Sequence, residues 1–244
     1  MKFFILAKLA CLVLLVGCGR YFGGPIHPVP KVQQDEYMVV EDDGSVTYDF
    51  ERLEISLRPL TDGELNRQFP THSIGGATAT NPFTFGDWKP LGESFTPPKY
   101  TVFLLSVKNY AYPKVRIDPA RMELVSTTSR RTYKPLTFEE LVEYYYSQAQ
   151  AYTGNGYDDY QERRDLLRRY LYRADFAYSG QELEGYLIFP LLAHDVTEFA
   201  VNMADVALRF DFRDEPTATA DLTFRYQRQV YKGYQPPSEL TIQP

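Results

Sequence analysis

Cys18 is the residue of this chain whose side chain and setting best suit covalent chemistry. A cysteine thiolate is a nucleophile that can be alkylated, and the 244 residues contain two cysteines, Cys11 and Cys18. Both lie in an apolar N-terminal stretch, in which residues 9–16 are all apolar. Gly17 and Gly19 flank Cys18 and leave the backbone open to a processing peptidase. We therefore expect the chemistry of this chain to be centred on Cys18.

The segment before Cys18 has the parts of a signal peptide. Lys2 and Lys8 supply positive charge, an apolar run follows, and a small residue precedes the expected cleavage point. The run is shorter than the roughly 20 apolar residues that span a bilayer. The sequence Leu15-Val16-Gly17-Cys18 resembles the lipobox of bacterial lipoproteins. This resemblance covers residues 1–18 and implies cleavage before Cys18, attachment of diacylglycerol to its thiol, and acylation of the new amino group with chains such as palmitate.

The same resemblance implies a cellular location. Two or more acyl chains anchor a protein stably where one does not, since each buried methylene contributes about 0.8 kcal/mol. Gly19 follows the cysteine, and in lipoproteins such a residue favours the outer membrane over retention at the inner one. The expected location is therefore the bacterial cell envelope, where a lipid anchor holds the protein on the outer membrane. An ordinary signal peptide and an anchor helix that contains a cysteine by chance are the alternatives.

Three segments are expected along the chain. Residues 1–17 form the signal peptide, and residues 18–36 form a lipidated tether because they contain three prolines, three glycines and no apolar periodicity. Residues 37–244 form the folded domain.

Composition narrows the function classes. Loss of Lys2 and Lys8 with the signal peptide takes the net charge from −6 to −8, which argues against nucleic-acid binding because that requires a basic surface. No cysteine remains for a disulfide, a catalytic thiolate or a metal, and the three histidines do not have metal-ligand spacing, so no cofactor is expected. His194-Asp195 could form a base and its orienting acid, but adjacent residues usually point apart. We expect a protein without catalytic activity, and an envelope hydrolase is one alternative.

Most of the domain has the pattern of antiparallel strands. Residues 100–107 are nearly continuously apolar and indicate a central strand with both faces buried. Later strands alternate apolar with polar residues, as at 208–213 and 222–227, which is typical of two-sheet sandwiches. We predict a mainly β fold, an immunoglobulin-like antiparallel β-sandwich. Residues 180–190, GQELEGYLIFP, loosely resemble the immunoglobulin-like domains of bacterial lipoproteins, although the Cys-Trp-Cys core signature is missing.

Two segments near the start of the domain depart from the regular strand pattern. The alternation of apolar residues changes phase at Glu51-Arg52, which predicts a β-bulge there. Residues 59–99 are rich in proline and glycine and are predicted to form a long loop, with a short helical turn after the capping box Thr61 to Glu64.

The period changes from two to about 3.6 between residues 137 and 174. Thr137 and Glu140 form a capping box, and apolar residues then recur on one helix face through Leu141 and Tyr145. Gly154 to Gly156 end this helix, and a second one follows. The pattern predicts an α-helical hairpin inserted between strands.

Tyrosine and arginine crowd this insertion, in a chain with 20 tyrosines and one tryptophan. Exposed tyrosine next to arginine is enriched at protein interfaces. We therefore predict a surface that contacts a protein partner, and a glycan-binding module is the second alternative. The predicted contact residues are Tyr145, Tyr146, Tyr157, Tyr160, Arg164 and Arg168.

Overall fold

The computed structural model describes residues 19–151 and 156–237. The signal peptide predicted for residues 1–17 and the predicted lipidation site Cys18 lie outside the described residues. The strands are β1 (Arg20–Pro28), β2 (Met38–Val40), β3 (Val46–Phe50), β4 (Leu53–Leu60), β5 (Tyr100–Asn109), β6 (Lys114–Arg116), β7 (Met122–Ser126), β8 (Thr132–Tyr133), β9 (Phe176–Tyr178), β10 (Gln181–Pro190), β11 (Glu198–Phe210) and β12 (Pro216–Gly233). The α-helices are α2 (Asp62–Gln68), α3 (Phe138–Ala151) and α4 (Gly156–Tyr170), and the short 3-10 turns are η1 (Lys31–Gln33), η2 (Pro70–His72), η3 (Gly76–Thr78) and η4 (Pro119–Arg121).

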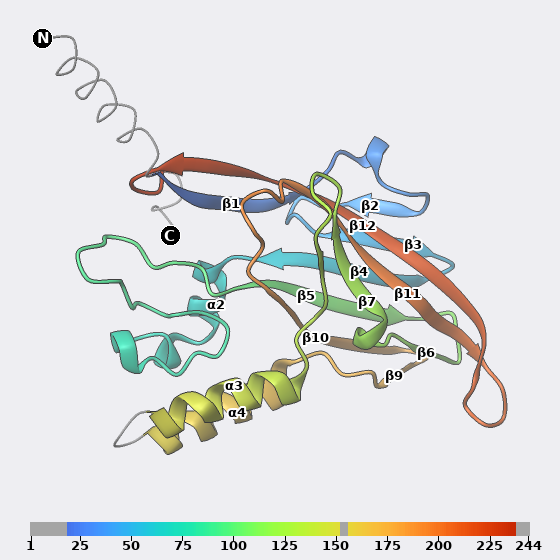
Figure 1. Ribbon diagram of the computed structural model, residues 1–244. Coiled ribbons are helices and arrows are strands. Elements are labelled where there is room, and N and C mark those ends of the chain that lie inside the picture. Colours follow the sequence, from blue (N-terminus) through green and yellow to red (C-terminus); the bar gives the residue numbers. More distant parts are fainter. Residues whose placement is uncertain (1–18, 152–155, 238–244) are drawn as a thin grey trace, which may run out of the picture.

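The described strands form two antiparallel sheets. One has the order β1-β12-β11-β6-β9, with β7 paired to β11 and β8 paired to β7. The other has the order β10-β5-β4-β3-β2. Figure 1 shows the two sheets as layers, with the long β11–β12 pair crossing over the β5 and β10 strands. The mainly β class predicted from the alternating pattern is confirmed, and the two sheets are consistent with a β-sandwich.

The first core lies between the sheets. Phe103, Leu105 and Val107 of β5 face Phe199 of β11 and Tyr226 of β12, and all five are buried. The ring of Phe103 lies 5.4 Å from that of Tyr226, whose hydroxyl donates to the carbonyl of Leu57 at 2.6 Å. A buried tyrosine needs such an acceptor. Burial of these large side chains from both sheets is what holds the layers together.

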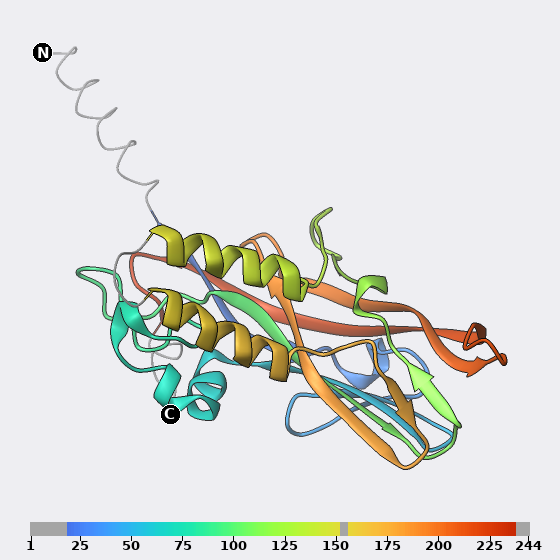
Figure 2. The ribbon, with the colours of Figure 1, turned by 90° about the horizontal axis from the view of Figure 1, so that it is seen from below.

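A second core lies on the other face of β5 and β10. Val102 and Ile188 point out of the sandwich and are covered by Leu141 of α3 and Leu167 of α4. Figure 2, in which the molecule is seen from below, shows α3 and α4 side by side in front of the sheet, with the 59–99 segment next to them. Both faces of β5 are therefore buried, as its continuous apolar run predicts.

The helices begin and end where capping chemistry allows. The Thr137 hydroxyl accepts from the backbone N–H of Glu140 at 3.2 Å, and the Glu140 carboxylate accepts from the N–H of Thr137 at 2.8 Å. Thr61 and Glu64 form the same reciprocal pair at the start of α2. Both predicted capping boxes are thus present. The rest of the 59–99 segment is pinned by Phe83, which is fully buried in the second core.

The tether predicted for residues 18–36 does not describe the structure. Arg20–Pro28 form β1, which pairs antiparallel with β12, and Lys31–Gln33 form η1. The register shifts between Gly23 and Ile26, around Pro25. Proline and glycine are tolerated here because β1 is an edge strand with an irregularity at that point. The composition of the segment misled the prediction because its partner strand lies about 200 residues away in sequence.

The bulge predicted at Glu51-Arg52 is also wrong. Both residues have positive φ, 50° and 66°, and they join Phe50 of β3 directly to Leu53 of β4. This is a two-residue hairpin turn, whose geometry requires positive φ at both positions. The phase of the alternation changes because the chain reverses, not because a residue is inserted. A further hairpin joins β2 to β3 around Asp43-Gly44, where Gly44 has a φ of 82°.

Candidate functional site

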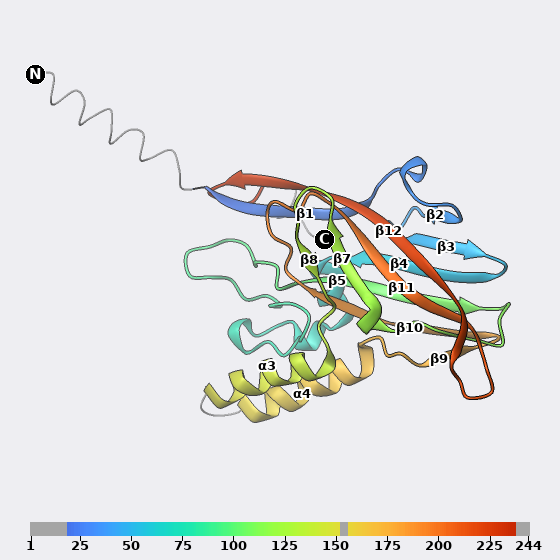
Figure 3. The ribbon, with the colours of Figure 1, turned by 45° about the vertical axis from the view of Figure 1, so that its right-hand side comes forward.

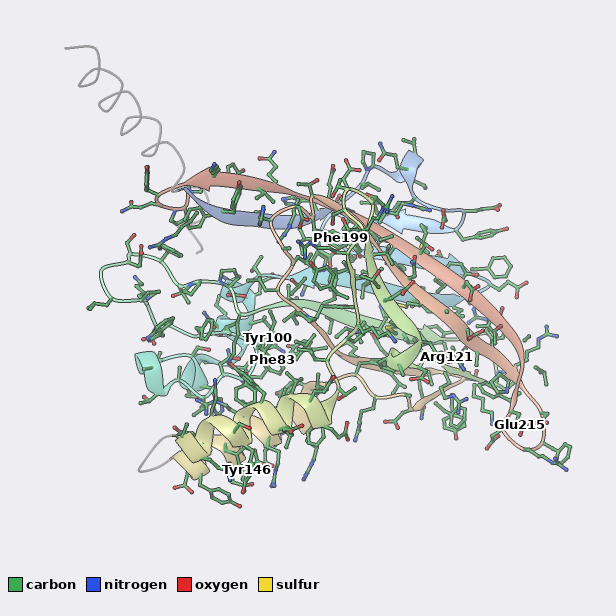
Figure 4. The ribbon with its side chains drawn as sticks, viewed as in Figure 1. Phe83, Tyr100, Arg121, Tyr146, Phe199 and Glu215 are labelled. Carbon is green, nitrogen blue, oxygen red and sulfur yellow. The ribbon has the colours of Figure 1, made fainter. Side chains whose placement is uncertain are left out.

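The six predicted contact residues fall into different environments. Figure 4 shows Tyr146 on the outer side of the helix pair, whereas Phe83 and Tyr100 lie between the helices and the sheet. Tyr145 is 1% exposed, and its hydroxyl donates to the carbonyl of Pro82 at 2.6 Å. The prediction of Tyr145 as a contact residue is therefore wrong, because its helix face is the one that packs on β5.

Two exposed tyrosines remain on the helix pair. Tyr146 of α3 is 44% exposed and Tyr157 of α4 is 60% exposed. Their rings lie 5.4 Å and 5.8 Å from the ring of Tyr160, which is itself nearly buried. The Arg164 guanidinium lies 5.9 Å from the same ring. We call Tyr146, Tyr157, Tyr160 and Arg164 the tyrosine surface.

The packing of Tyr160 gives this surface a fixed shape. The rings of Tyr146 and Tyr157 each contact the ring of Tyr160, and this contact limits the rotamers that the two exposed side chains can adopt. The Arg164 Nε is buried and has no hydrogen-bond partner among the described residues. Such a surface offers apolar area, hydroxyl groups and a guanidinium to a partner.

Arg168 lies away from the tyrosine surface, at the other end of α4. It lines a groove of about 410 Å³ between the start of α3, the end of α4 and β10. The apolar floor of this groove includes Leu136, Leu167 and Ile188. Arg168 therefore does not belong with the four residues of the tyrosine surface, although the sequence places it only four residues after Arg164.

Lys99 occupies an aromatic cage beneath the helices that the sequence did not suggest. Its ammonium lies 4.7 Å from the ring centre of Tyr145, 5.0 Å from Phe85, 5.7 Å from Tyr100 and 5.9 Å from Tyr144. These distances are within the range of cation–π attraction. The only local signal is a lysine directly before an apolar strand, after Pro97-Pro98.

The cage perturbs two ionisable groups. Burial and, to a smaller extent, the positive charge of Arg163 lower the pKa of Lys99 to about 7, against the opposing effect of Asp62. Burial also raises the pKa of Asp62 to about 7, against the attraction of Lys99. Arg163 is held in place by its hydrogen bond to the carbonyl of Ala79 at 2.8 Å. Asp62 of α2, Lys99 and Arg163 of α4 thus form one cluster. Burial disfavours the charged forms of Asp62 and Lys99 in it.

We expect Lys99 to give the domain a distinct pH dependence of stability. Between pH about 7 and its unfolded pKa of about 10.4, the unfolded chain binds a proton at Lys99 that the folded chain lacks, so the free energy of unfolding rises with pH. Asp62 has the opposite effect at pH values below 7. There the folded chain binds a proton at Asp62 that the unfolded chain lacks, so the free energy of unfolding falls as the pH rises. The free energies of unfolding of the wild type and of Lys99→Met can be measured with urea. Their difference should change by up to about 1.4 kcal/mol per pH unit between pH 7.5 and 9.5. A difference that is constant over this range would contradict the assignment.

The side chains of His194 and Asp195 have different partners. The His194 ring stacks on Tyr21 at 4.1 Å with an interplanar angle of 15°. Asp195 instead accepts from Arg131 Nε with both carboxylate oxygens at 2.9 Å, which lowers its pKa. Within the part of the chain that the structure describes, His194 has no side-chain hydrogen bond to a hydroxyl or carboxylate.

A second groove lies on the outer face of the β10-β5-β4-β3-β2 sheet, beyond the helices. Its volume is about 430 Å³, and side-chain hydroxyls and carboxylates of several strands of this sheet line it. In this groove the Lys108 Nζ lies 3.8 Å from the Oε2 of Glu54 and 3.7 Å from the Oε1 of Glu182. The side chains facing it include Glu41, Asp43, Ser45, Thr47, Asp49, Ser56, Arg58, Ser106 and Glu184.

Neither a cluster of metal ligands nor a membrane-spanning helix is found in the ranges that the structure describes. No group of three or more His, Cys, Asp or Glu side chains there could hold a metal ion. No helix in residues 19–151 and 156–237 combines the length and the apolar character needed to cross a bilayer. Comparison of the chain with protein-family models, with curated proteins and with solved structures finds no match.

Proposed function

We propose that this protein is a lipid-anchored component of the bacterial cell envelope that binds a protein partner and has no catalytic activity of its own. The anchor is the acylated Cys18, on the outer membrane by its resemblance to lipoproteins. The binding site is the tyrosine surface of α3 and α4. The observation that carries the proposal is the pair of exposed rings, Tyr146 and Tyr157, packed on the buried Tyr160.

The chemistry of this surface favours a protein partner. Tyrosine contributes large contact area with few rotatable bonds, so little conformational entropy is lost when a partner orders it. Arg164 can pair with a carboxylate or a carbonyl of the partner through the guanidinium. An exposed pair of preordered tyrosines beside an arginine therefore has the composition of an interface centre.

The proposal includes an immunoglobulin-like fold as the scaffold of the binding surface. We interpret the two sheets as an immunoglobulin-like sandwich, and α3 and α4, which lie between β8 and β9 in sequence, as an insertion into it. In this interpretation the sandwich is the scaffold and the insertion presents the binding surface. Fold alone does not assign function, so the proposal depends on the tyrosine surface.

The anchor is tested by replacing Cys18. Cys18→Ala should abolish incorporation of labelled palmitate and release the protein from the membrane fraction, because no other thiol remains after cleavage. Cys11→Ala is the matched control, since Cys11 lies in the segment that is removed, and it should keep the label. Retention of label by Cys18→Ala would refute the anchor.

The binding surface is tested by photocrosslinking in intact cells. A photoreactive benzoylphenylalanine in place of Tyr157 should give one discrete product, and Tyr146→Ser in the same chain should remove most of it. The same probe in place of Tyr178, which is 50% exposed on β9, is the control and should give no such product. Equal products from both positions, or none from position 157, would show that the tyrosine surface is not the interface.

A glycan-binding module is the second candidate. The polar groove on the outer sheet face supports it, since hydroxyls of Ser45, Thr47, Ser56 and Ser106 and several carboxylates line one concave surface. Such groups could accept and donate hydrogen bonds to sugar hydroxyls. None of the described residues that line the groove is an aromatic residue on which a sugar ring could stack, and this favours a protein partner over a glycan.

A further inference from the structure

The start of β1 is very close to the proposed anchor. Arg20 is the first residue of β1 and pairs with Gly233. Two Cα–Cα steps of about 3.8 Å each are the most that can separate it from Cys18. The headgroup layer of one leaflet is roughly 5–8 Å thick. Acyl chains that leave Cys18 for the hydrocarbon core would therefore hold Arg20 at or within the headgroup layer.

This part of the domain is also braced against its neighbours. The strand pair formed by residues 20–26 and 228–233 extends past β11, whose first residue, Glu198, lies opposite Gln227. Two loops support it from the sides. The nearly buried Arg228 donates to the carbonyls of Leu192, Ala193 and Val196, so the loop after β10 is fixed to the strand pair.

The other supporting loop is part of the 59–99 segment. Arg20 forms an ion pair with Glu93, and the ring of Phe22 lies 5.4 Å from that of Phe95. In Figures 1, 2 and 3 this loop lies next to the start of β1 in each view. The braced strand pair leaves no free linker between residue 20 and the domain, so the domain follows the orientation of its anchor.

The residues exposed at this end have the chemistry of a membrane interface. Leu91 is fully exposed, two residues before Glu93, and Tyr234 is 73% exposed, one residue after the end of β12. Tyr21 is exposed and lies 5.6 Å from the Lys232 ammonium. Tyrosine is enriched at the level of lipid headgroups, and lysine is attracted to anionic phospholipids.

We propose that Tyr21, Leu91, Lys232 and Tyr234 form a membrane-contact corner that rests on the phospholipid surface beside the acylated Cys18. The inference rests on the proposed lipid anchor and adds the orientation of the domain. The strands then run away from the bilayer, and the β11–β12 turn, where Figure 4 labels Glu215, is at the far end. Phe212 in that turn is 89% exposed and points into water.

The test compares two exposed apolar positions at opposite ends of the domain. The full-length chain, expressed in bacterial cells, carries a nitroxide label on Leu91→Cys or on Phe212→Cys and is reconstituted into vesicles of phosphatidylethanolamine and phosphatidylglycerol. The label at position 91 should lose most of its collisions with a water-soluble nickel quencher when vesicles are added. The label at position 212 should keep its collisions. Mass spectrometry of the same samples establishes whether the chain is acylated.

Each outcome is decisive. If the chain is acylated and vesicle-bound but the label at position 91 is as accessible to the quencher as that at 212, the membrane-contact corner is refuted while the anchor stands. If the chain carries no lipid, both the anchor and the corner are refuted. Protection at position 91 alone supports the corner, and its loss on Tyr21→Ser with Tyr234→Ser would assign the contact to these residues.

Discussion

Replacing Gly185 with alanine is expected to destabilise the domain by about 3 kcal/mol or more, because the new methyl group would overlap backbone atoms. Gly185 lies in β10, opposite Leu105 of β5. The chain leaving α4 packs against β10 at this point, where Leu171 forms a parallel bridge with Tyr186 and the N–H of Tyr172 donates to the carbonyl of Tyr186 at 3.0 Å. A Cβ on residue 185 would lie 2.4 Å from the Tyr172 Cα and 2.6 Å from its N.

The cost is large because no flexible side chain can yield. Relief would require the segment after α4 to move off the sheet, which would break the hydrogen bond to Tyr186 and lift Tyr172 from the first core. Urea unfolding is the measurement, and 3 kcal/mol corresponds to a midpoint shift of about 1.5 M for a slope of about 2 kcal/mol/M.

Gly44→Ala is the matched control for this substitution. Gly44 has φ 82° and open space around its Cα, so alanine there should cost about 1 kcal/mol through backbone strain alone. Equal losses for Gly185→Ala and Gly44→Ala would show that the contact between Gly185 and Tyr172 is looser than the structure describes.

Replacing Asn109 with leucine is the second change with a large expected effect, again about 3 kcal/mol, since it removes four hydrogen bonds at a buried site. The Asn109 Nδ2 donates to the carbonyls of Tyr112 and Ala177, both at 2.8 Å. Its Oδ1 accepts from the N–H groups of Ala111 and Tyr112. The side chain thus closes the turn after β5 and also ties that strand to β9 in the opposite sheet.

Leucine has similar volume, so the loss should come from polar groups left without partners rather than from a cavity. Asn109→Asp tests this directly, because it keeps the acceptors but places oxygen against two carbonyls, and it should be at least as unstable. Asn202→Leu is the control. Asn202 is half-buried and accepts one hydrogen bond from Thr223 at 3.2 Å, so its loss should cost less than about 1 kcal/mol. Similar costs at positions 109 and 202 would contradict the role of Asn109.

Local patterns predicted much of the secondary structure. The capping boxes at Thr61 and Thr137 are present, since both partners of a capping box lie within one helical turn. The apolar run of β5 is buried on both faces because a continuous apolar strand is stable only where layers cover it from both sides. These features depend on near neighbours in sequence or on burial alone.

Predictions failed where the deciding partner is distant. Residues 20–28 have the composition of a linker, yet β12 holds them as a strand from the other end of the chain. At Glu51-Arg52 a turn and an insertion both change the phase of the apolar alternation, and only strand pairing distinguishes the two. Tertiary hydrogen bonds override weak local preference in both cases.

The candidate site divides in the same way. The sequence identified the helices and the crowding of tyrosine and arginine on them, but it could not say which rings face the sheet. Tyr145 and Tyr146 are adjacent, and the first is buried against Pro82 while the second is exposed. The cage around Lys99 gathers rings from α3, β5 and the 59–99 segment, so no spacing in the sequence could reveal it.

The sequence by itself determined the mainly β class, the helices that interrupt the strands and the expectation of acylation at Cys18, because periodicity, capping and a processing motif act over a few neighbouring residues. The tertiary structure alone decided which tyrosines are exposed, that Lys99 lies in an aromatic cage where burial lowers its pKa, and that β1 begins immediately after the expected anchor. Those properties arise from contacts between residues far apart in the chain, where burial and strand pairing fix what each side chain can reach.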